Sequence, residues 1–138
     1  MEALLMPPTT VIDDEFVSLW YHAEDKVVHH KIKSFLPRGA FEKLLTSGAE
    51  LLEKHGAKKW LSDDRSNVVI TPEDMKWADQ VWHPRMRKAG FEYWAIVIPS
   101  MMVGAMQLKN IREKRRRQGL TVEIFETVEE AMAWLRSR

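Results

Sequence analysis

The sequence predicts one α/β domain with a five-stranded mixed sheet and four helices, in the order β-β-α-β-α-β-α-β-α. Short runs rich in β-branched and aromatic residues alternate with longer segments whose apolar residues recur every three or four positions. Alternating strands and helices imply parallel strands joined by right-handed crossovers, and the two strands at the start predict an antiparallel hairpin. The 138 residues suffice for one such domain, which we assign to residues 14–138, with residues 1–13 as an N-terminal extension.

The hairpin and the first helix occupy the first part of the domain. "EFVSLWYH" (15–22) and "KVVHHKIK" (26–33) have the composition of strands, and the short polar "AED" between them closes the hairpin. From Arg38 to His55 the apolar residues recur at helical spacing, and Gly56 follows where a helix C-cap belongs. This segment therefore predicts a helix with one face on the sheet.

A short strand and a second helix follow. "KWLS" (59–62) predicts the strand. "TPED" (71–74) places a threonine at the N-cap, a proline at the first helical position and two acids in the first turn, which predicts a helix reaching about Ala89. Pro84 lies inside this helix and predicts a kink, because proline has no backbone N–H to donate.

The last part of the chain predicts two more strands and two more helices. "EYWAIVIP" (92–99) is almost continuously apolar, which is typical of a central strand covered on both faces. A third helix is expected over residues 100–118, and "TVEIF" (121–125) is the fifth strand. "TVEE" (127–130) has the pattern of a capping box and begins the final helix.

The charge balance favours no charged partner. With 21 Lys and Arg against 20 Asp and Glu, the formal net charge of +1 supplies no field that would direct the chain to nucleic acid or to a membrane. The one basic cluster, "REKRRRQ" (112–118), lies at the end of a predicted helix, where cations complement the helix dipole. The chain shows neither a signal-peptide pattern nor a run long enough to span a membrane, so we expect a cytoplasmic protein.

Metal and cofactor chemistry find little support. The chain contains no cysteine, which excludes disulfides, thiolate catalysis and cysteine-ligated metal sites within it. His29 and His30 are adjacent in a predicted strand and therefore point to opposite faces, so they do not ligate one ion. His30 shares its face with Val28 and Ile32, which predicts a hydrogen-bonded, partly buried histidine. We expect no metal, no cofactor and no catalytic residue.

Four segments resemble the SpoIIAA-like branch of the STAS superfamily: "VVHHKIKSF", "KKWLSDDR", "WHPRMRKAGFEYWAIVIP" and "IFETVEEAMAWL". The resemblance covers roughly residues 14–135 and implies a compact α/β domain that works through protein contacts or, as in the related SEC14-type members, through apolar ligands. STAS regulators present a phosphorylatable serine, in an Asp-Ser-Gly context, between the third strand and the second helix. Ser66 is nearest that position, but no glycine follows it, and Asp63 and Asp64 would oppose a phosphate by like charge.

Two loops at the carboxyl ends of predicted parallel strands form the candidate ligand site, because ligands of open α/β sheets bind there. The third strand leads into Asp63, Asp64, Arg65, Ser66 and Asn67. The fourth strand leads into the start of a helix with free backbone amides and adaptable apolar side chains, which supplies Ser100, Met101, Met102 and Met106. In the alternative interpretation, the aspartates cap local amides, Arg65 forms an ion pair and most of the methionines fill the core.

The second predicted helix carries a candidate interface. A stripe that includes Met75 and Trp82 predicts its core face, while Trp77, with Val81 and Pro84 near it, points away from that stripe. A large aromatic residue off the core face suggests self-association. The alternative is a rotation of the helix at Pro84 that packs Trp77 over an edge of the sheet.

Three hypotheses for function follow. The first is a non-enzymatic STAS-like interaction or regulatory domain, which forms a homodimer or binds another protein. The second is a carrier or sensor of a small apolar or amphipathic ligand, held between loop 62–70 and the methionine-rich helix start. The third is an enzyme. It ranks last because the sequence has no G-x-S-x-G, Walker, G-x-G-x-x-G or H-E-x-x-H motif, which leaves only an unrecognised acid/base site at Asp63, Asp64 and Arg65.

Overall fold

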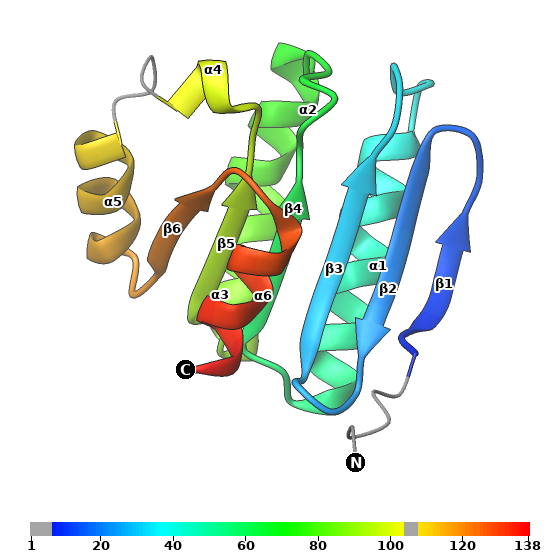
Figure 1. Cartoon of the computed structure of the whole chain (residues 1–138). Helices are drawn as coiled ribbons and strands as arrows, with labels where there is room; N and C mark the ends of the chain where they lie inside the picture. The colour runs from blue at the N-terminus through cyan, green and yellow to red at the C-terminus, as the bar shows by residue number, and fades with distance from the viewer. Residues whose placement is uncertain (1–6, 104–107) are drawn as a thin grey trace.

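The computed structural model describes residues 7–103 and 108–138, which form an α/β domain around one six-stranded sheet (Figure 1). The strands are β1 (Thr9–Asp13), β2 (Val17–His22), β3 (Val27–Ile32), β4 (Lys59–Asp63), β5 (Tyr93–Val97) and β6 (Thr121–Phe125). The helical segments are α1 (Ala40–His55), α2 (Pro72–Trp77), the π-helix η1 (Ala78–Trp82), α3 (His83–Ala89), α4 (Ser100–Val103), α5 (Leu108–Arg117) and α6 (Val128–Arg136).

The strands lie in the sheet in the same order as in the chain. Strand β2 pairs antiparallel with both β1 and β3, whereas β3, β4, β5 and β6 pair parallel with one another in turn. The α/β class and the mixed sheet with an antiparallel hairpin are therefore confirmed. The predicted strand number is one too low, because Thr9–Asp13 of the assigned extension pairs with β2. This edge strand is almost entirely exposed, and its two apolar residues, Val11 and Ile12, are adjacent, so it lacks the alternation of apolar and polar residues by which a half-buried strand is found in a sequence.

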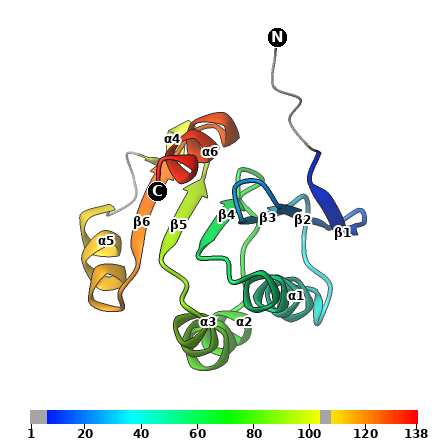
Figure 2. The same cartoon turned by 90° about the horizontal axis from the view of Figure 1, so that it is seen from below.

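Helices cover the two faces of the sheet unequally (Figure 2). The helices α1, α2 and α3 lie on one face, and α6 lies on the other face over β4, β5 and β6. This double cover of β5 accounts for its almost continuous apolar sequence. No helix among the described residues is long and apolar enough to cross a membrane.

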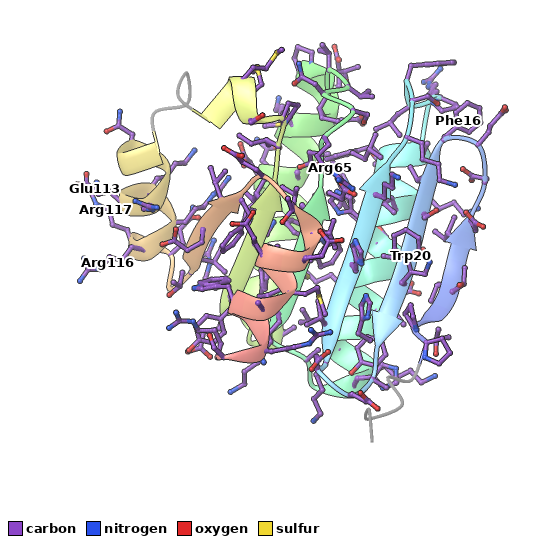
Figure 3. All side chains as sticks on the ribbon, in the orientation of Figure 1. Phe16, Trp20, Arg65, Glu113, Arg116 and Arg117 are labelled. Carbon is purple, nitrogen blue, oxygen red and sulfur yellow. The ribbon has the colours of Figure 1, made fainter. Side chains whose placement is uncertain are left out.

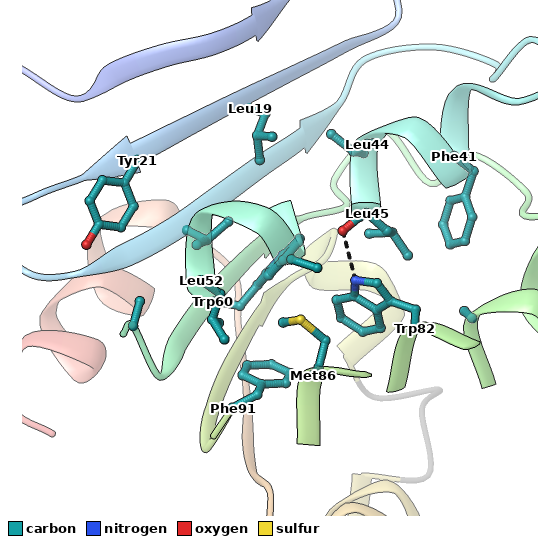
Figure 4. Packing of buried hydrophobic residues seen from close by; sticks show 14 of the residues in the cluster. Leu19, Tyr21, Phe41, Leu44, Leu45, Leu52, Trp60, Trp82, Met86 and Phe91 are labelled. Atoms are coloured by element: carbon teal, nitrogen blue, oxygen red, sulfur yellow. Dashed lines mark hydrogen bonds between the residues drawn. The ribbon is translucent and has the colours of Figure 1, made fainter. Parts of the chain in front are cut away.

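The larger hydrophobic cluster of the described residues fills the space between the sheet and α1 and α3 (Figure 4). Trp60 from β4 is fully buried in it, and Trp82, Met86 and Phe91 pack around its ring. Gly48 of α1 lies directly above this ring, where a Cβ atom on residue 48 would be 2.1 Å from the Cη2 atom of Trp60. The helix therefore approaches the sheet at a distance that only a glycine permits.

The helix ends follow the predicted signals. Thr71 Oγ1 accepts a hydrogen bond of 3.1 Å from the Asp74 amide at the start of α2. Thr127 Oγ1 accepts from the Glu130 amide at 3.2 Å, which confirms the N-cap of the predicted capping box. The Glu130 carboxylate turns back to the Thr127 hydroxyl, which donates to it at 2.9 Å, and not to the Thr127 amide as in a full capping box. Gly56 ends α1 with a φ of 60°, in the left-handed region that glycine favours.

The second predicted helix is divided into α2, η1 and α3. In η1 the His83 amide donates to the carbonyl of Ala78, five residues back, instead of four. Pro84 follows directly and has no N–H for the next carbonyl in the ladder. Where the sequence predicts a kink at Pro84, the structure has a π-helical turn just before it, a feature often found at functional sites.

Candidate functional site

A cavity of about 400 Å³ lies between the sheet and the helices α1, α2 and η1. Side chains from β3, β4 and β5 form its floor, and Phe41 and Leu45 of α1 form part of its roof. The loop over residues 64–70 and Met102 of α4 line it at the carboxyl ends of the parallel strands. Ligands of open α/β sheets bind at this edge.

Three tryptophans form the central wall of the cavity. Trp60 and Trp94 are direct neighbours on β4 and β5, so their side chains point to the same face of the sheet. Trp82 of η1 meets both rings edge to face, with ring centroids 5.2 Å from Trp60 and 6.2 Å from Trp94. This arrangement favours stability, because edge-to-face pairs are a preferred aromatic geometry.

Each of these indole N–H groups is satisfied within the protein. The acceptors are His30 Nδ1 at 2.9 Å for Trp60, the Leu45 carbonyl oxygen at 2.9 Å for Trp82, drawn as a dashed line in Figure 4, and Ser62 Oγ at 2.8 Å for Trp94. The indoles therefore present carbon surface to the cavity. A wall of this kind suits an apolar guest.

His30 is fixed by hydrogen bonds at both ring nitrogens. Its Nδ1 atom accepts from Trp60, so Nε2 carries the proton and donates to Asp64 Oδ1 at 3.0 Å. The predicted hydrogen bonding of His30 is confirmed, and the side chain is buried where the sequence predicts partial burial. With both nitrogens engaged, His30 has no free lone pair with which to act as a general base in this arrangement.

The side of the cavity nearest α5 is polar. His83 is buried there, with its ring centroid 5.7 Å from that of Trp94. Burial and the positive charge of Arg115 lower the pKa of His83 to about 4, so its imidazole is neutral at pH 7. Arg115 lies over the Trp94 ring, with Cζ 5.4 Å from the centroid, and burial lowers the pKa of its guanidinium. The Asp79 carboxylate opposes that shift.

The cavity gathers only some of the predicted ligand residues. Asp64, Ser66, Asn67 and Met102 line it. Asp63, Arg65, Ser100 and Met101 do not, and the Met101 side chain is 85% exposed. Met106 lies outside the described residues. The Ser66 hydroxyl donates to the carbonyl oxygen of Ile32.

Asp63 and Arg65 form a separate ion pair. Arg65 donates from Nε to Asp63 Oδ1 and from Nη2 to Oδ2, both at 2.8 Å. Burial alone would raise the pKa of Asp63, but the Arg65 hydrogen bonds and charge outweigh it and lower that pKa. Asp63 and Asp64 make different contacts, so the three residues of the predicted acid/base site do not converge.

The residues of the predicted interface divide between the exposed side of the second helical region and the main hydrophobic cluster, against which Trp77 packs. Trp77 is half-buried, and its ring meets Phe41 edge to face at 6.3 Å. Val81 and Pro84 are exposed. Met75, which the sequence predicts on the core face, is exposed as well, because α2 extends past the carboxyl edge of the sheet.

A second pair of histidines lies on the opposite face of the sheet. His22 Nε2 and His29 Nδ1 share a hydrogen bond of 3.0 Å, while His29 Nε2 is buried and has no partner in the part of the chain that the structure describes. Burial, with the charges of His22 and His30 in second place, lowers the pKa of His29 to about 3. No group of three or more potential metal ligands occurs among the described residues.

The sequence patterns do not identify the tryptophan wall, His83 or Arg115 as parts of one site. The strand register offers one signal, since Trp60 and Trp94 occupy matching positions in two predicted strands. In the sequence, Arg115 cannot be distinguished from the other basic residues of its cluster, which face solvent, as Figure 3 shows for Arg116 and Arg117.

No protein-family model matches the chain, no curated protein is significantly similar to it, and no solved structure matches its fold at a significant level.

Proposed function

We propose that this protein binds a small apolar or amphipathic ligand in the tryptophan-walled cavity and acts as a carrier or sensor of that ligand in the cytosol. The observation that carries the proposal is the cavity itself, which has a volume of about 400 Å³ and a largely apolar wall. Ligand sites are typically clefts of roughly 300–1,000 Å³ with mostly apolar walls and a few polar groups. The STAS-like resemblance is consistent with this role, because its SEC14-type members take apolar ligands.

The chemistry of the wall supports an apolar guest. The three indole N–H groups are already bound, so a polar ligand would gain no hydrogen bond from them. An apolar ligand gains about 0.8 kcal/mol for each methylene group that it buries. The polar groups gather instead at the carboxyl edge of the sheet and at the side nearest α5.

The test is saturable binding of a neutral apolar dye, N-phenyl-1-naphthylamine, followed by its fluorescence. Ala78→Phe adds a ring inside the cavity from η1, whereas Ala133→Phe makes the same change at an exposed position of α6. We expect wild type and Ala133→Phe to bind one dye molecule per chain and Ala78→Phe to lose most of that binding. Circular dichroism checks that Ala78→Phe is folded. If it is not, Ile96→Phe is used in its place, because it fills the same cavity from β5.

The absence of saturable dye binding by folded wild type would refute the proposal. Binding that survives in a folded Ala78→Phe and in Ile96→Phe would place the dye elsewhere on the molecule. Intrinsic fluorescence gives an independent check, because three of the six tryptophans line the cavity.

A second candidate function is the STAS-like interaction or regulatory domain, as a homodimer or with another protein. The observation that favours it is the exposure of Val81, which is 51%, beside the half-buried Trp77. Native mass spectrometry of wild type and Trp77→Ala tests the homodimer. A monomeric wild type, or a dimer that Trp77→Ala leaves intact, would contradict self-association through this surface.

A further inference from the structure

Arg115 differs from the other arginines of its cluster because its side chain turns toward the cavity. Its guanidinium lies over Trp94 and donates to Gln118 Oε1 at 3.0 Å. Arg116 and Arg117 are exposed and project away from the outer side of α5 (Figure 3). Among the described residues, no carboxylate lies within ion-pair distance of Arg115. Arg115 is therefore a half-buried charge without a counter-ion in the described part of the chain.

His83 supplies a second polar group beside it. The side chain is 8% exposed, lines the same cavity, and has no hydrogen-bond partner for its ring nitrogens in the described parts of the chain. Its ring packs against Trp82, with centroids 4.8 Å apart, which fixes its position at the cavity wall. A neutral imidazole offers one N–H donor and one acceptor. The ring nitrogens of His83 are not among the fully buried unpartnered atoms of the described residues, so they remain accessible from the cavity side.

We propose that the ligand carries a carboxylate head group that binds between Arg115 and His83, while its apolar body lies against the tryptophans; this inference rests on the proposed function. Guanidinium and imidazole N–H groups are both donors, and a planar carboxylate accepts from two donors at once. A singly charged head matches Arg115, the one arginine or lysine that lines the cavity among the described residues. Binding would give Arg115 its counter-ion in a site where the low dielectric strengthens the attraction.

The two carboxylates that line the cavity do not cancel this attraction. Asp64 accepts the hydrogen bond from His30 at the opposite side. Asp79 is exposed, so solvent screens its charge more than it screens the half-buried Arg115. If Asp79 nevertheless dominated, the cavity would prefer a cationic head group, and a cationic probe separates the two cases.

The experiment compares three probes with the same ten-carbon chain, namely decanoate, decanol and decyltrimethylammonium, at pH 7 by displacement of the neutral dye. We expect wild type to bind decanoate about tenfold or more tightly than decanol. Arg115→Gln should weaken decanoate by a similar factor and leave decanol unchanged. Arg117→Gln removes a charge from the exposed side of the same helix and should change neither affinity. Urea unfolding of each variant checks that it is folded. If Arg115→Gln is not folded, Arg115→Lys replaces it as a variant that changes the guanidinium and retains the charge.

A second readout follows the His83 imidazole by NMR. Decanoate should raise the pKa of His83, because its charge offsets the effect of Arg115, whereas decanol should not. Equal binding of decanoate and decanol, with no effect of Arg115→Gln, would overturn the carboxylate inference and leave the proposed function standing. If decyltrimethylammonium bound most tightly of the three probes, the carboxylate inference would be overturned, and the cavity would prefer a cationic head group that pairs with Asp79. Failure of all three probes and of the dye to bind would refute the proposed function itself.

Discussion

Substitution of Gly48 by alanine provides a sharp test of the packing between α1 and the sheet. In a helix interior, glycine to alanine normally stabilises by about 0.5–1 kcal/mol. Here the new Cβ atom would lie 2.1 Å from Cη2 and 2.6 Å from Cζ3 of Trp60, far inside the optimum of roughly 3.5–4.0 Å for two carbon atoms. The ring cannot easily move, because Trp60 is fully buried, donates to His30 and packs against Trp82.

Overpacking of a close-packed core costs about 1–3 kcal/mol, and this clash falls in the upper part of that range. After the gain in helix propensity, we expect Gly48→Ala to lose about 1–2 kcal/mol of unfolding free energy. Urea unfolding should show a lower midpoint with an unchanged slope. Ser47→Ala, at the neighbouring position of α1, has the propensity gain without this clash and should stay within about 0.5 kcal/mol of wild type.

Trp60→Phe removes the outer ring atoms that cause the clash. On this background Gly48→Ala should become neutral or stabilising, and the coupling energy of the double-mutant cycle should approach the full cost of the clash. A Gly48→Ala variant as stable as wild type, or the same loss with and without Trp60, would show that the close approach of α1 to the sheet is not as described.

Three further perturbations test other parts of the structure. Burial holds the pKa of His29 near 3, below the unfolded value of about 6.5, so its stabilising contribution is complete above that unfolded value and falls as the pH drops, by up to about 1.4 kcal/mol per pH unit. His29→Leu should therefore make the unfolding free energy, measured with urea, depend less on pH between pH 6 and 4. An unchanged pH dependence would contradict this. Arg65→Ala leaves the buried Asp63 carboxylate without its partner and should cost about 2 kcal/mol, less than for a fully buried pair because Arg65 is partly exposed; a loss below about 0.5 kcal/mol in thermal or urea unfolding would refute the pairing. Thr127→Ala removes the cap of α6 and should cost about 1 kcal/mol, whereas Thr127→Ser should restore most of it, and equal stability of the two variants would argue against the cap.

Local patterns predict most of the fold. The Thr71 and Thr127 caps and the C-cap at Gly56 are encoded by residues only a few positions apart, and the structure confirms them. Strand β1 escapes prediction because its exposed residues carry no apolar alternation. The STAS-like assignment remains a prediction from the resemblance.

The candidate site is only partly predictable. Loop 62–70 is expected at the ligand-binding edge because parallel strands direct their carboxyl ends there, and Asp64, Ser66 and Asn67 do line the cavity. The spatial separation of Asp63 from Asp64 follows from the alternation of side chains along a strand. The partner of each carboxylate is harder to foresee, since His30 lies 34 residues away from Asp64.

Except for strand β1 and the division of the second helix, the sequence alone determined the order of the strands and helices, the capped helix ends and the face of the sheet to which each strand residue points, because short-range periodicity and capping carry that information. Only the tertiary structure decided that a cavity exists and that Arg115 and His83 meet Trp94 at its wall. A cavity depends on the distance between a helix and the sheet, and that distance is set by contacts such as the one between Gly48 and Trp60. Periodicity gives the direction of a side chain, but close packing of residues far apart in the chain decides what it meets.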